Sequence, residues 1–277
     1  MIEYFPEFGV RGATGALCLA LGFLALPARA DSVSATYSVS LVGLPIGVAR
    51  LAADLSPTHY RIEATAKLSG FASIVSNSRG AANGSGAIIA GKVAPEGYAT
   101  TASNSSQTRT VRMSLAGNAV TGVEISPPFE DKPDRVPLFD KDRRGVIDPV
   151  GAFILPVAGN APLVGPAACN RTIPIFDGYT RFDINLTYVG QRNVAAKGYS
   201  GPVAVCSARY QPIAGHRPDR PATKFMMENK DLEVWLAPIE SARVLMPYRL
   251  SVRTMVGTTV VEASEFRIAA AKLGAAN

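Results

Sequence analysis

Alternation of apolar and polar residues is the feature that most constrains the fold of this chain. Over residues 60–68 every second side chain is apolar, and Arg61, Glu63 and Lys67 lie between them. The same pattern recurs at residues 37–41, 111–115, 182–188, 232–236 and 248–252. A period of two turns one face of a strand towards a core and the other towards solvent. The sequence therefore predicts a mainly β fold in which an antiparallel sheet wraps around its core.

Turn and helix signals complete this expectation. Gly117-Asn118 separates two of the predicted strands and is typical of a tight hairpin turn. Asp148-Pro149 offers an N-cap followed by proline at the first helical position. The apolar residues that follow at helical spacing are Val150, Phe153, Ile154 and Val157. Pro156 limits this predicted helix to roughly two turns, and residues 71–77 are a second candidate. We expect a curved or spiral sheet, open and barrel-like, with one or two short helices.

Residues 1–30 have the order of a secretory signal peptide. Arg11 precedes an apolar run, and Ala28-Arg29-Ala30 places small residues at the −3 and −1 positions of a cut before Asp31. The run is shorter than a membrane-spanning helix requires. We expect cleavage after Ala30, export to the periplasm, and a mature chain that does not span the membrane. An uncleaved N-terminal anchor is the alternative.

The remainder is interpreted as a single β-rich domain over residues 31–268. Residues 126–148 contain several prolines and a dense group of charges, as a linker does. Two packed halves that meet in this segment are therefore the alternative. The Ala-rich residues 269–277 are expected to form a flexible tail.

The charge balance argues against one class of partner. The chain has a formal net charge of +6, and the four charges of the signal segment cancel. The basic residues are spread out, so that no block of like charges resembles a nucleic-acid arm. We expect no nucleic-acid partner and consider an envelope lipid, a glycan or an envelope protein instead.

Cysteine usage predicts one crosslink. Removal of the signal removes Cys18 and leaves Cys169 and Cys206. An even number of cysteines in an exported protein favours a disulfide, which here would close a loop of about 38 residues and contribute about 4 kcal/mol. Two unpaired buried thiols are the alternative. His59 and His216 are the only histidines and neither lies near a cysteine in sequence, so we expect no metal site and no cofactor.

No recognisable catalytic motif is present, and the candidate site residues are few. The triplet Gly84-Ser85-Gly86 lacks the frame of a hydrolase elbow. Of the two histidines, His216 is the better candidate for function because it lies in a turn. Asp177 and Asp183 could form the carboxylate pair of a hydrolase, although Asp177-Gly178 also reads as a simple turn.

Trp235 is the single tryptophan and lies on a strand with apolar residues on both faces. Core packing explains this pattern, and the lining of a lipid-accepting groove is the alternative. Trp235, His216 and Asp177 are therefore the candidate binding residues.

Several short phrases in a fixed order resemble an exported family, domain of unknown function 3108, that is common in Gram-negative bacteria. The phrases are VGLPIG at 42–47, DPVGAF at 148–153, Cys169 followed by FDG at 176–178 and RFD at 181–183, YSGP at 199–202 with Cys206, YQPIAGH at 210–216, LEVWLAP at 232–238 and PYR at 247–249. The resemblance implies a periplasmic protein rich in antiparallel β-structure, similar in style to envelope-integrity proteins with a spiral β-sheet and one disulfide. It supports the pairing of Cys169 with Cys206 and marks the turns at Asp177-Gly178 and Gly215-His216 for inspection. It implies no catalytic residues.

Three functional hypotheses follow from these observations. The first is a non-enzymatic periplasmic protein that supports envelope integrity and binds a lipid or glycan fragment in its curved sheet. The second is an envelope hydrolase that uses Asp177 and Asp183. The third is a scaffold that binds another envelope protein through a sheet edge.

Overall fold

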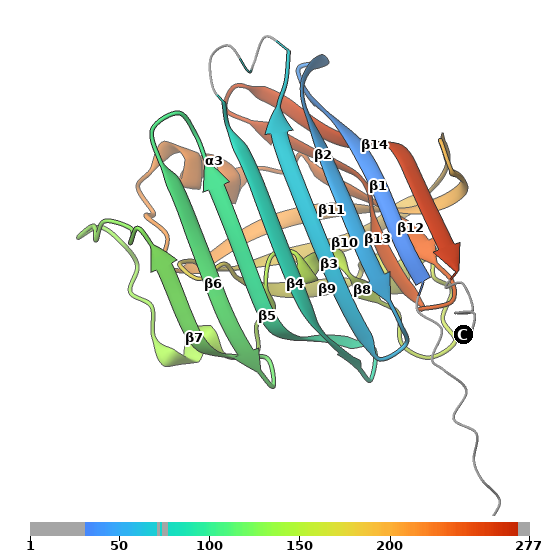
Figure 1. Cartoon of the computed structure of the whole chain (residues 1–277), viewed down its shortest axis with the longest axis horizontal. Helices are drawn as coiled ribbons and strands as arrows, with labels where there is room; N and C mark the ends of the chain where they lie inside the picture. Colours follow the sequence, from blue (N-terminus) through green and yellow to red (C-terminus); the bar gives the residue numbers. More distant parts are fainter. Residues whose placement is uncertain (1–30, 71–72, 74–76, 271–277) are drawn as a thin grey trace, which may run out of the picture.

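Strands make up most of the computed structural model, which describes residues 31–70, 73 and 77–270 (Figure 1). The first half contains β1 (Asp31–Leu41), β2 (Leu44–Leu55), β3 (His59–Leu68), β4 (Arg79–Ile89), β5 (Lys92–Ser103), β6 (Thr108–Ala116) and β7 (Ala119–Ser126). The second half contains β8 (Leu155–Pro156), β9 (Arg171–Phe176), β10 (Arg181–Ala196), β11 (Tyr199–Ala214), β12 (Leu232–Ile239), β13 (Val244–Thr254) and β14 (Gly257–Ala270). The short helices are η1 (Asp140–Arg143), η2 (Gly151–Phe153), α2 (Pro166–Cys169) and α3 (Pro221–Glu228). The predicted fold class, a curved antiparallel sheet with short helices, is confirmed.

All of these strands belong to one sheet. The order is β7-β6-β5-β4-β3-β2-β1-β14-β13-β12-β11-β10-β9, and β8 pairs with β13. Within β1–β7 and within β9–β14 each strand therefore lies beside its neighbour in sequence, and β1 also pairs with β14 and so joins the two halves. The predicted hairpin between β6 and β7 is present, and Gly117 and Asn118 both have the positive φ that its turn needs (56° and 59°).

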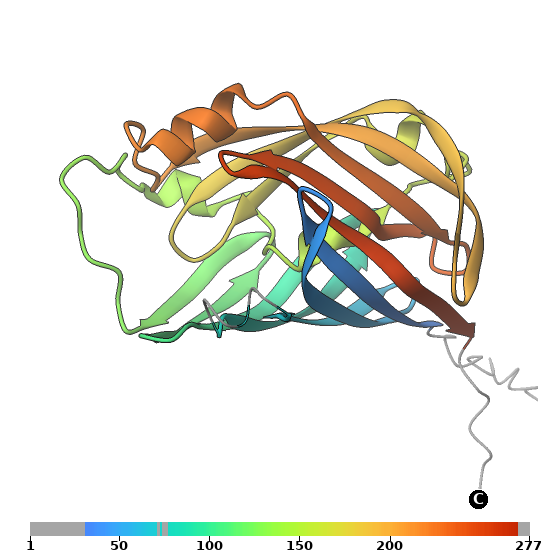
Figure 2. The same cartoon turned by 90° about the horizontal axis from the view of Figure 1, so that it is seen from above.

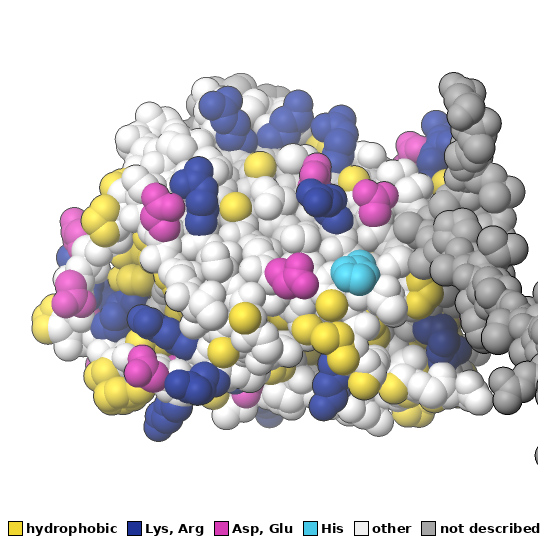
Figure 3. Space-filling model, turned by 60° about the horizontal axis from the view of Figure 1, so that its bottom comes forward, with side chains coloured by type: hydrophobic (Ala, Val, Ile, Leu, Met, Phe, Trp, Pro, Cys, Tyr) yellow, Lys and Arg dark blue, Asp and Glu magenta, His cyan; other side chains and the backbone are white. Residues whose placement is uncertain are grey.

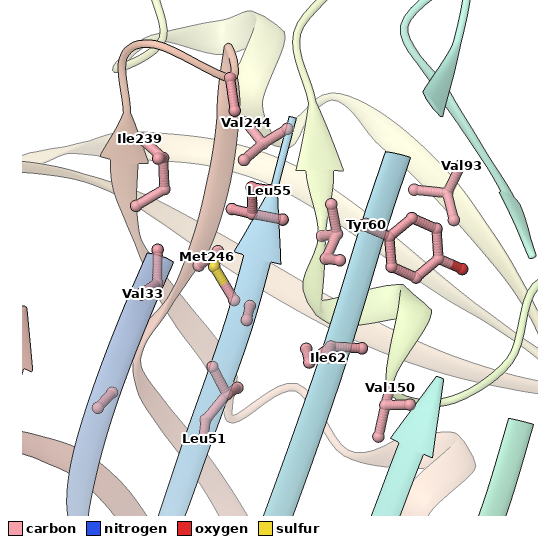
Figure 4. Packing of buried hydrophobic residues seen from close by; sticks show 14 of the residues in the cluster. Val33, Leu51, Leu55, Tyr60, Ile62, Val93, Val150, Ile239, Val244 and Met246 are labelled. Atoms are coloured by element: carbon pink, nitrogen blue, oxygen red, sulfur yellow. The ribbon is translucent and has the colours of Figure 1, made fainter. Parts of the chain in front are cut away.

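The sheet curls so that its two halves face each other across an apolar interior (Figure 2). Alternate residues of the first half point inward, among them Val33, Leu55 and Ile62. They meet Ile239 and Met246 of the second half, as Figure 4 shows. All five side chains are at most 1% exposed. This alternation explains why the period-2 pattern was visible in the sequence.

The segment between β7 and β9 closes the gap between the two edges of the sheet. Val146 donates its N–H to Asn118 O. Ile147 N–H donates to Pro174 O of β9, and Phe176 N–H of β9 donates to Ile147 O. Arg144 forms an isolated bridge to Ala119, and Ile147 forms one to Ile175. The part after residue 144 is thus built into the interior, and the prediction of a linker over 126–148 is wrong for these residues.

The helix predicted after Asp148-Pro149 is much shorter than expected. Asp148 does cap it, because Oδ1 accepts the N–H groups of Val150 at 3.0 Å and Gly151 at 2.8 Å. Only η2 forms, however, and Leu155 and Pro156 then pair with β13. Pairing with β13 ends the helix, and Pro156 cannot extend it because proline lacks an N–H and its ring clashes with the preceding turn of a helix. The candidate helix at 71–77 falls largely outside the described residues, as does the predicted signal peptide.

A second apolar layer covers the opposite face of β10–β13. It contains Leu163, Ala168, Leu186 and Val234, and Met226 of α3 packs against its margin. The disulfide between Cys169 of α2 and Cys206 of β11 lies here, with both cysteines fully buried and their Cα atoms 5.5 Å apart. The crosslink fastens the segment that precedes β9 onto the sheet.

Two elements differ from the sequence prediction. Helix α3 was not predicted, although Pro221 at its first position is a helix-start signal. Strand β14 continues through Ala270, where Ala269 and Ala270 pair with Ser32 and Asp31, so the predicted flexible tail starts too early.

None of the helices in the described part of the chain has the length and hydrophobicity needed to cross a bilayer.

The hydroxyl of Tyr37 provides a test of how the two halves are held together. It donates a buried hydrogen bond of 2.7 Å from β1 to Pro247 O in β13. Tyr37→Phe should lower the free energy of unfolding by about 1–2 kcal/mol, because a buried carbonyl loses its partner. Urea denaturation measures this change. Tyr188→Phe is the control, since within the described residues that hydroxyl has no partner, and an equal loss in both variants would contradict the interpretation.

Candidate functional site

A cavity of about 700 Å³ occupies one end of the interior of the curled sheet. Its wall is built from a row of small residues that face one another across neighbouring strands. Ala66 of β3 pairs with Gly80 of β4, and Gly80 pairs with Ala102 of β5. Small side chains at directly opposed positions leave space that no neighbour fills. Leu68, Tyr98 and Val111 complete an apolar lining, and this volume suits a small-molecule site.

The same inner face is filled at the other end of the strands. There β3 carries Tyr60 and Ile62, which are 3% and 0% exposed, in place of alanine. Val150 and Ile154 of the connecting segment belong to the same cluster, and Figure 4 shows Val150 close to Ile62. The change from large to small side chains along one strand therefore decides where the interior is solid and where it is hollow.

A stack of aromatic and cationic groups borders the cavity. The rings of Phe129 and Tyr179 are stacked with centroids 3.9 Å apart. The guanidinium of Arg109 lies 3.9 Å from the Phe129 centroid, and that of Arg135 lies 3.2 Å from the Tyr179 centroid. These four side chains form a continuous column from the connecting segment to the β9–β10 turn. Such cation–π contacts hold a flexible segment in place while leaving apolar edges towards the cavity.

Asp177, a predicted site residue, lines this cavity but is committed to its turn. Oδ1 accepts the N–H groups of Tyr179 at 2.8 Å and Thr180 at 2.6 Å, and Oδ2 accepts the Thr180 hydroxyl at 2.6 Å. Asp183 is paired with Arg181 at 2.6 Å. The lining includes no carboxylate other than Asp177 among the described residues. The geometry therefore gives no opposed carboxylate pair of the kind that a glycosidase uses.

His216 does not line the cavity. Its backbone carbonyl accepts a hydrogen bond from Val136 N–H, and Gly215 N–H donates to Val136 O. Burial lowers the pKa of His216, which favours the neutral imidazole. The turn therefore anchors the segment that carries Arg135, and the histidine supports the site from outside.

Trp235 also lies apart from the cavity. Its indole N–H donates to Glu233 at 2.7 Å, and the guanidinium groups of Arg192 and Arg249 lie 5.5 and 4.7 Å from the ring centroid. Arg249 is in turn paired with Glu233 at 3.3 Å and Glu262 at 3.2 Å. The tryptophan thus belongs to a charged network on β12 and β13. It does not line the cavity, so the structure gives no support to the interpretation that it lines a lipid-accepting groove.

A second hollow of about 700 Å³ lies at the opposite end, between the β4–β5 turn and the segment before β9. Its basic lining residues are Lys92 and Arg171, and the guanidinium of Arg171 already donates to Pro156 O at 2.8 Å and to Ala167 O. We therefore place the candidate site in the first cavity. No cluster of three or more metal-ligating side chains occurs within the described ranges.

The positive charge is distributed rather than gathered on the face shown in Figure 3, where basic and acidic side chains are interspersed. The cavity differs, because Arg109 lines it from β6 and Asp177 is already hydrogen-bonded. Lys67 and Arg79 lie at its edge, where they alternate with the inward Ala66 and Gly80 and so point to the outer face. An apolar hollow with basic residues at its border has the polarity of a site for an acidic amphiphile.

Comparison with known proteins identifies the family. A family model described as "Protein of unknown function (DUF3108)" matches residues 36–264. The chain belongs to the DUF3108 family. Residues that line the cavity, from Val39 to Tyr179, lie within the matched DUF3108 region.

One solved structure similar to this DUF3108 chain is described as a β-barrel-like protein of domain of unknown function DUF1849 from Brucella abortus. The two are 10% identical, with a TM-score of 0.48, and the match covers 87% of this chain and 99% of the other. No curated protein matches the sequence.

The sequence predicted one lining residue, Asp177, and missed the others. Ala66, Gly80 and Ala102 carry no chemical signal of their own and are far apart in the chain. Only the register of three strands brings them together.

Proposed function

We propose that this chain is a non-enzymatic protein of the periplasm that supports the envelope by binding an amphiphilic lipid, with the apolar part of the lipid in the cavity at Ala66, Gly80 and Ala102. The observation that carries the proposal is the hollow of about 700 Å³ between Leu68, Tyr98 and Val111, whose walls expose mostly apolar atoms. Cavities of this size with apolar walls are the usual sites for small apolar ligands. The walls expose mostly apolar atoms, although Thr100, Asn104 and Gln107 also line the cavity. We take this balance to favour a lipid over a glycan fragment, whose hydroxyl groups would require more polar partners.

The periplasmic location is part of the same proposal. A signal-like N-terminus and a buried disulfide support it, because such crosslinks persist in oxidising compartments. Cell fractionation, followed by mass spectrometry without reductant, tests it. Recovery of the chain in the cytoplasm, with free thiols at Cys169 and Cys206, would be incompatible with it.

A scaffold that binds through a sheet edge is less well supported. β7 is an edge strand, but Glu124 lies within it and a register shift interrupts its pairing near Leu115. Charges and irregular register are features by which proteins protect an edge from pairing.

Gly80→Phe tests the proposed cavity. A Cβ at this position would meet only Thr101 O, at an ordinary 3.7 Å, so the ring can extend into the hollow without displacing the backbone. We expect at least about tenfold weaker binding of N-phenyl-1-naphthylamine, which corresponds to about 1.4 kcal/mol. Fluorescence titration of the secreted chain measures the affinity, and competition with lysophosphatidylglycerol and with a soluble muropeptide distinguishes lipid from glycan.

Ala81→Phe is the matched control. It adds the same side chain to the next residue of β4, which points to the outer face because successive residues of a strand alternate. Binding should be unchanged in this variant. Equal binding by Gly80→Phe and the unaltered chain, or competition by the muropeptide alone, would refute the proposed lipid site.

A further inference from the structure

Two neighbouring turns expose an unusual amount of apolar surface. Val42 lies in the β1–β2 turn and Leu44 directly follows that turn, and they are 67% and 70% exposed. Met255 and Val256 form the β13–β14 turn and are 59% and 74% exposed. Val42 N–H donates to Thr258 O at 2.9 Å, so the two turns touch. We call these four apolar residues the apolar tip. Turns normally carry glycine, asparagine or other polar residues, and large apolar side chains there require an explanation.

The backbone of Val42 makes the exposure more informative. Its φ is +51°, in the left-handed region that β-branched residues avoid. Asparagine or glycine would fit this position with less strain. The chain therefore keeps a strained and exposed valine where a polar residue would be more stable, which points to a role for its side chain.

Two like charges lie directly opposite one another at the same end of the sheet. Lys67 of β3 pairs in register with Arg79 of β4, and both are exposed. Like charges at opposed positions destabilise a sheet. Neither residue has an ion-pair partner in the described part of the chain. An external anion would remove the repulsion.

The apolar tip and the cationic pair lie at one end of the molecule. The sheet is antiparallel, so the ends of β1, β3 and β13 share that end, as Figures 1 and 2 show. Ser69 N–H donates to Ile46 O at 2.9 Å, which ties the end of β3 to β2 just beyond Leu44. Leu68 and Val39, at the ends of β3 and β1, line the cavity, so the cavity reaches the same end.

We propose that this end docks onto an anionic lipid bilayer, with the apolar tip inserted among the acyl chains and Lys67 and Arg79 against the lipid phosphates. Apolar side chains beside basic residues are the combination that binds proteins to the surface of acidic membranes. The inference rests on the proposed function in one respect, because docking here would bring the cavity against a source of lipid.

Co-sedimentation of the secreted chain with vesicles tests the docking surface. The chain should bind vesicles made of phosphatidylglycerol and phosphatidylcholine in equal parts, and bind phosphatidylcholine alone much more weakly. Val42→Asn with Val256→Ser should weaken binding at least about tenfold through lost apolar insertion. Lys67→Glu with Arg79→Glu should weaken it by a similar factor or more, with the effect diminished in high salt.

Matched controls lie at the other end of the sheet. Ile89→Ser removes an apolar side chain that is 62% exposed, and Lys92→Glu reverses an exposed charge, so neither should affect binding to vesicles. Val42→Asn relieves backbone strain, so an undiminished melting temperature in that variant excludes unfolding as the cause of lost binding.

The outcomes separate this inference from the proposed function. The tip variants should still bind N-phenyl-1-naphthylamine, and Gly80→Phe should still bind vesicles. If Gly80→Phe loses probe binding but the unaltered chain binds no vesicles, the cavity proposal stands and the docking surface alone is overturned. Equal binding to both vesicle types would overturn the role of Lys67 and Arg79. Concentration-dependent dimers that the tip variants abolish would show that a second copy, rather than a bilayer, covers the tip.

Discussion

Replacement of Cys169 and Cys206 together by alanine is expected to lower the free energy of unfolding by about 4 kcal/mol. The bond joins residues 37 positions apart, and the loss follows from the extra freedom that the unfolded chain gains without a crosslink of this length. Both cysteines are fully buried, so part of the loss also reflects removal of packed sulfur atoms. Denaturation in guanidinium chloride, without reductant, measures the difference.

Reduction of the unaltered chain separates the crosslink from the packing. With dithiothreitol present, the unaltered chain should lose nearly as much stability as the double variant, and the double variant should not respond. Cys169→Ala alone should resemble the double variant. A change below about 1 kcal/mol on reduction would mean that the segment before β9 is held mainly by its apolar contacts.

Replacement of Asp148 by asparagine is expected to abolish a large pH dependence of stability. Asp148 is fully buried, and burial raises the pKa of its carboxyl group to about 6 despite the hydrogen bonds from Gly151 and Val150. Oδ2 and the hydroxyl of Tyr60 have no hydrogen-bond partner within the described residues, and both lie close to Gly151. The native state therefore favours the protonated carboxyl.

The direction of the effect follows from proton binding. Between the ordinary pKa of 3.8 and a pKa of about 6, the folded chain holds a proton that the unfolded chain has released. Stability should therefore fall as pH rises through this interval, by about 3 kcal/mol in total, and stay lower above it. Below about pH 4 both states are protonated and the full contribution is present.

Asp148→Asn keeps an acceptor for the N–H groups of Val150 and Gly151 and presents an N–H towards Tyr60. Its stability should match that of the unaltered chain at pH 4 within about 1 kcal/mol and exceed it at pH 8. Asp140→Asn, an exposed carboxyl in the same connecting segment, is the control and should leave the profile in place. Thermal denaturation across pH measures all three. Parallel profiles for Asp148→Asn and the unaltered chain would show that this carboxyl is already ionised at low pH.

Most of the strands could be predicted from sequence because apolar and polar residues alternate within each of them, whatever the rest of the chain does. Tyr60 and Ile62 alternate with charged residues, and the hairpin at Gly117-Asn118 is specified by two adjacent residues. The length of the helix after Asp148 could not be predicted in this way. Val150 and Ile154 have helical spacing, but they are apolar because they fill the interior of the sheet, a contact with distant strands.

The candidate site was less predictable, for a similar reason. Asp177 could be identified because aspartate before glycine marks a turn. Its carboxylate is there to accept the N–H groups of that turn, and not to take part in a reaction. The cavity depends on Ala66, Gly80 and Ala102, whose small size conveys nothing until register places them side by side. His216 was selected because it lies in a turn and Trp235 because both faces of its strand carry apolar residues, and neither lines the cavity.

The pairing of β1 with β14 has a consequence for the order of folding. Ser32 and Ala269 touch although they are 237 positions apart. The first strand can pair with β2 early, but its other edge stays open until the last strand is available. Contacts of such long range form slowly, since a large loop must close first. If the chain is exported unfolded, β1 emerges from the membrane before β14 and keeps one edge unpaired until β14 follows. The interval before β14 arrives is therefore when this protein most needs protection from aggregation.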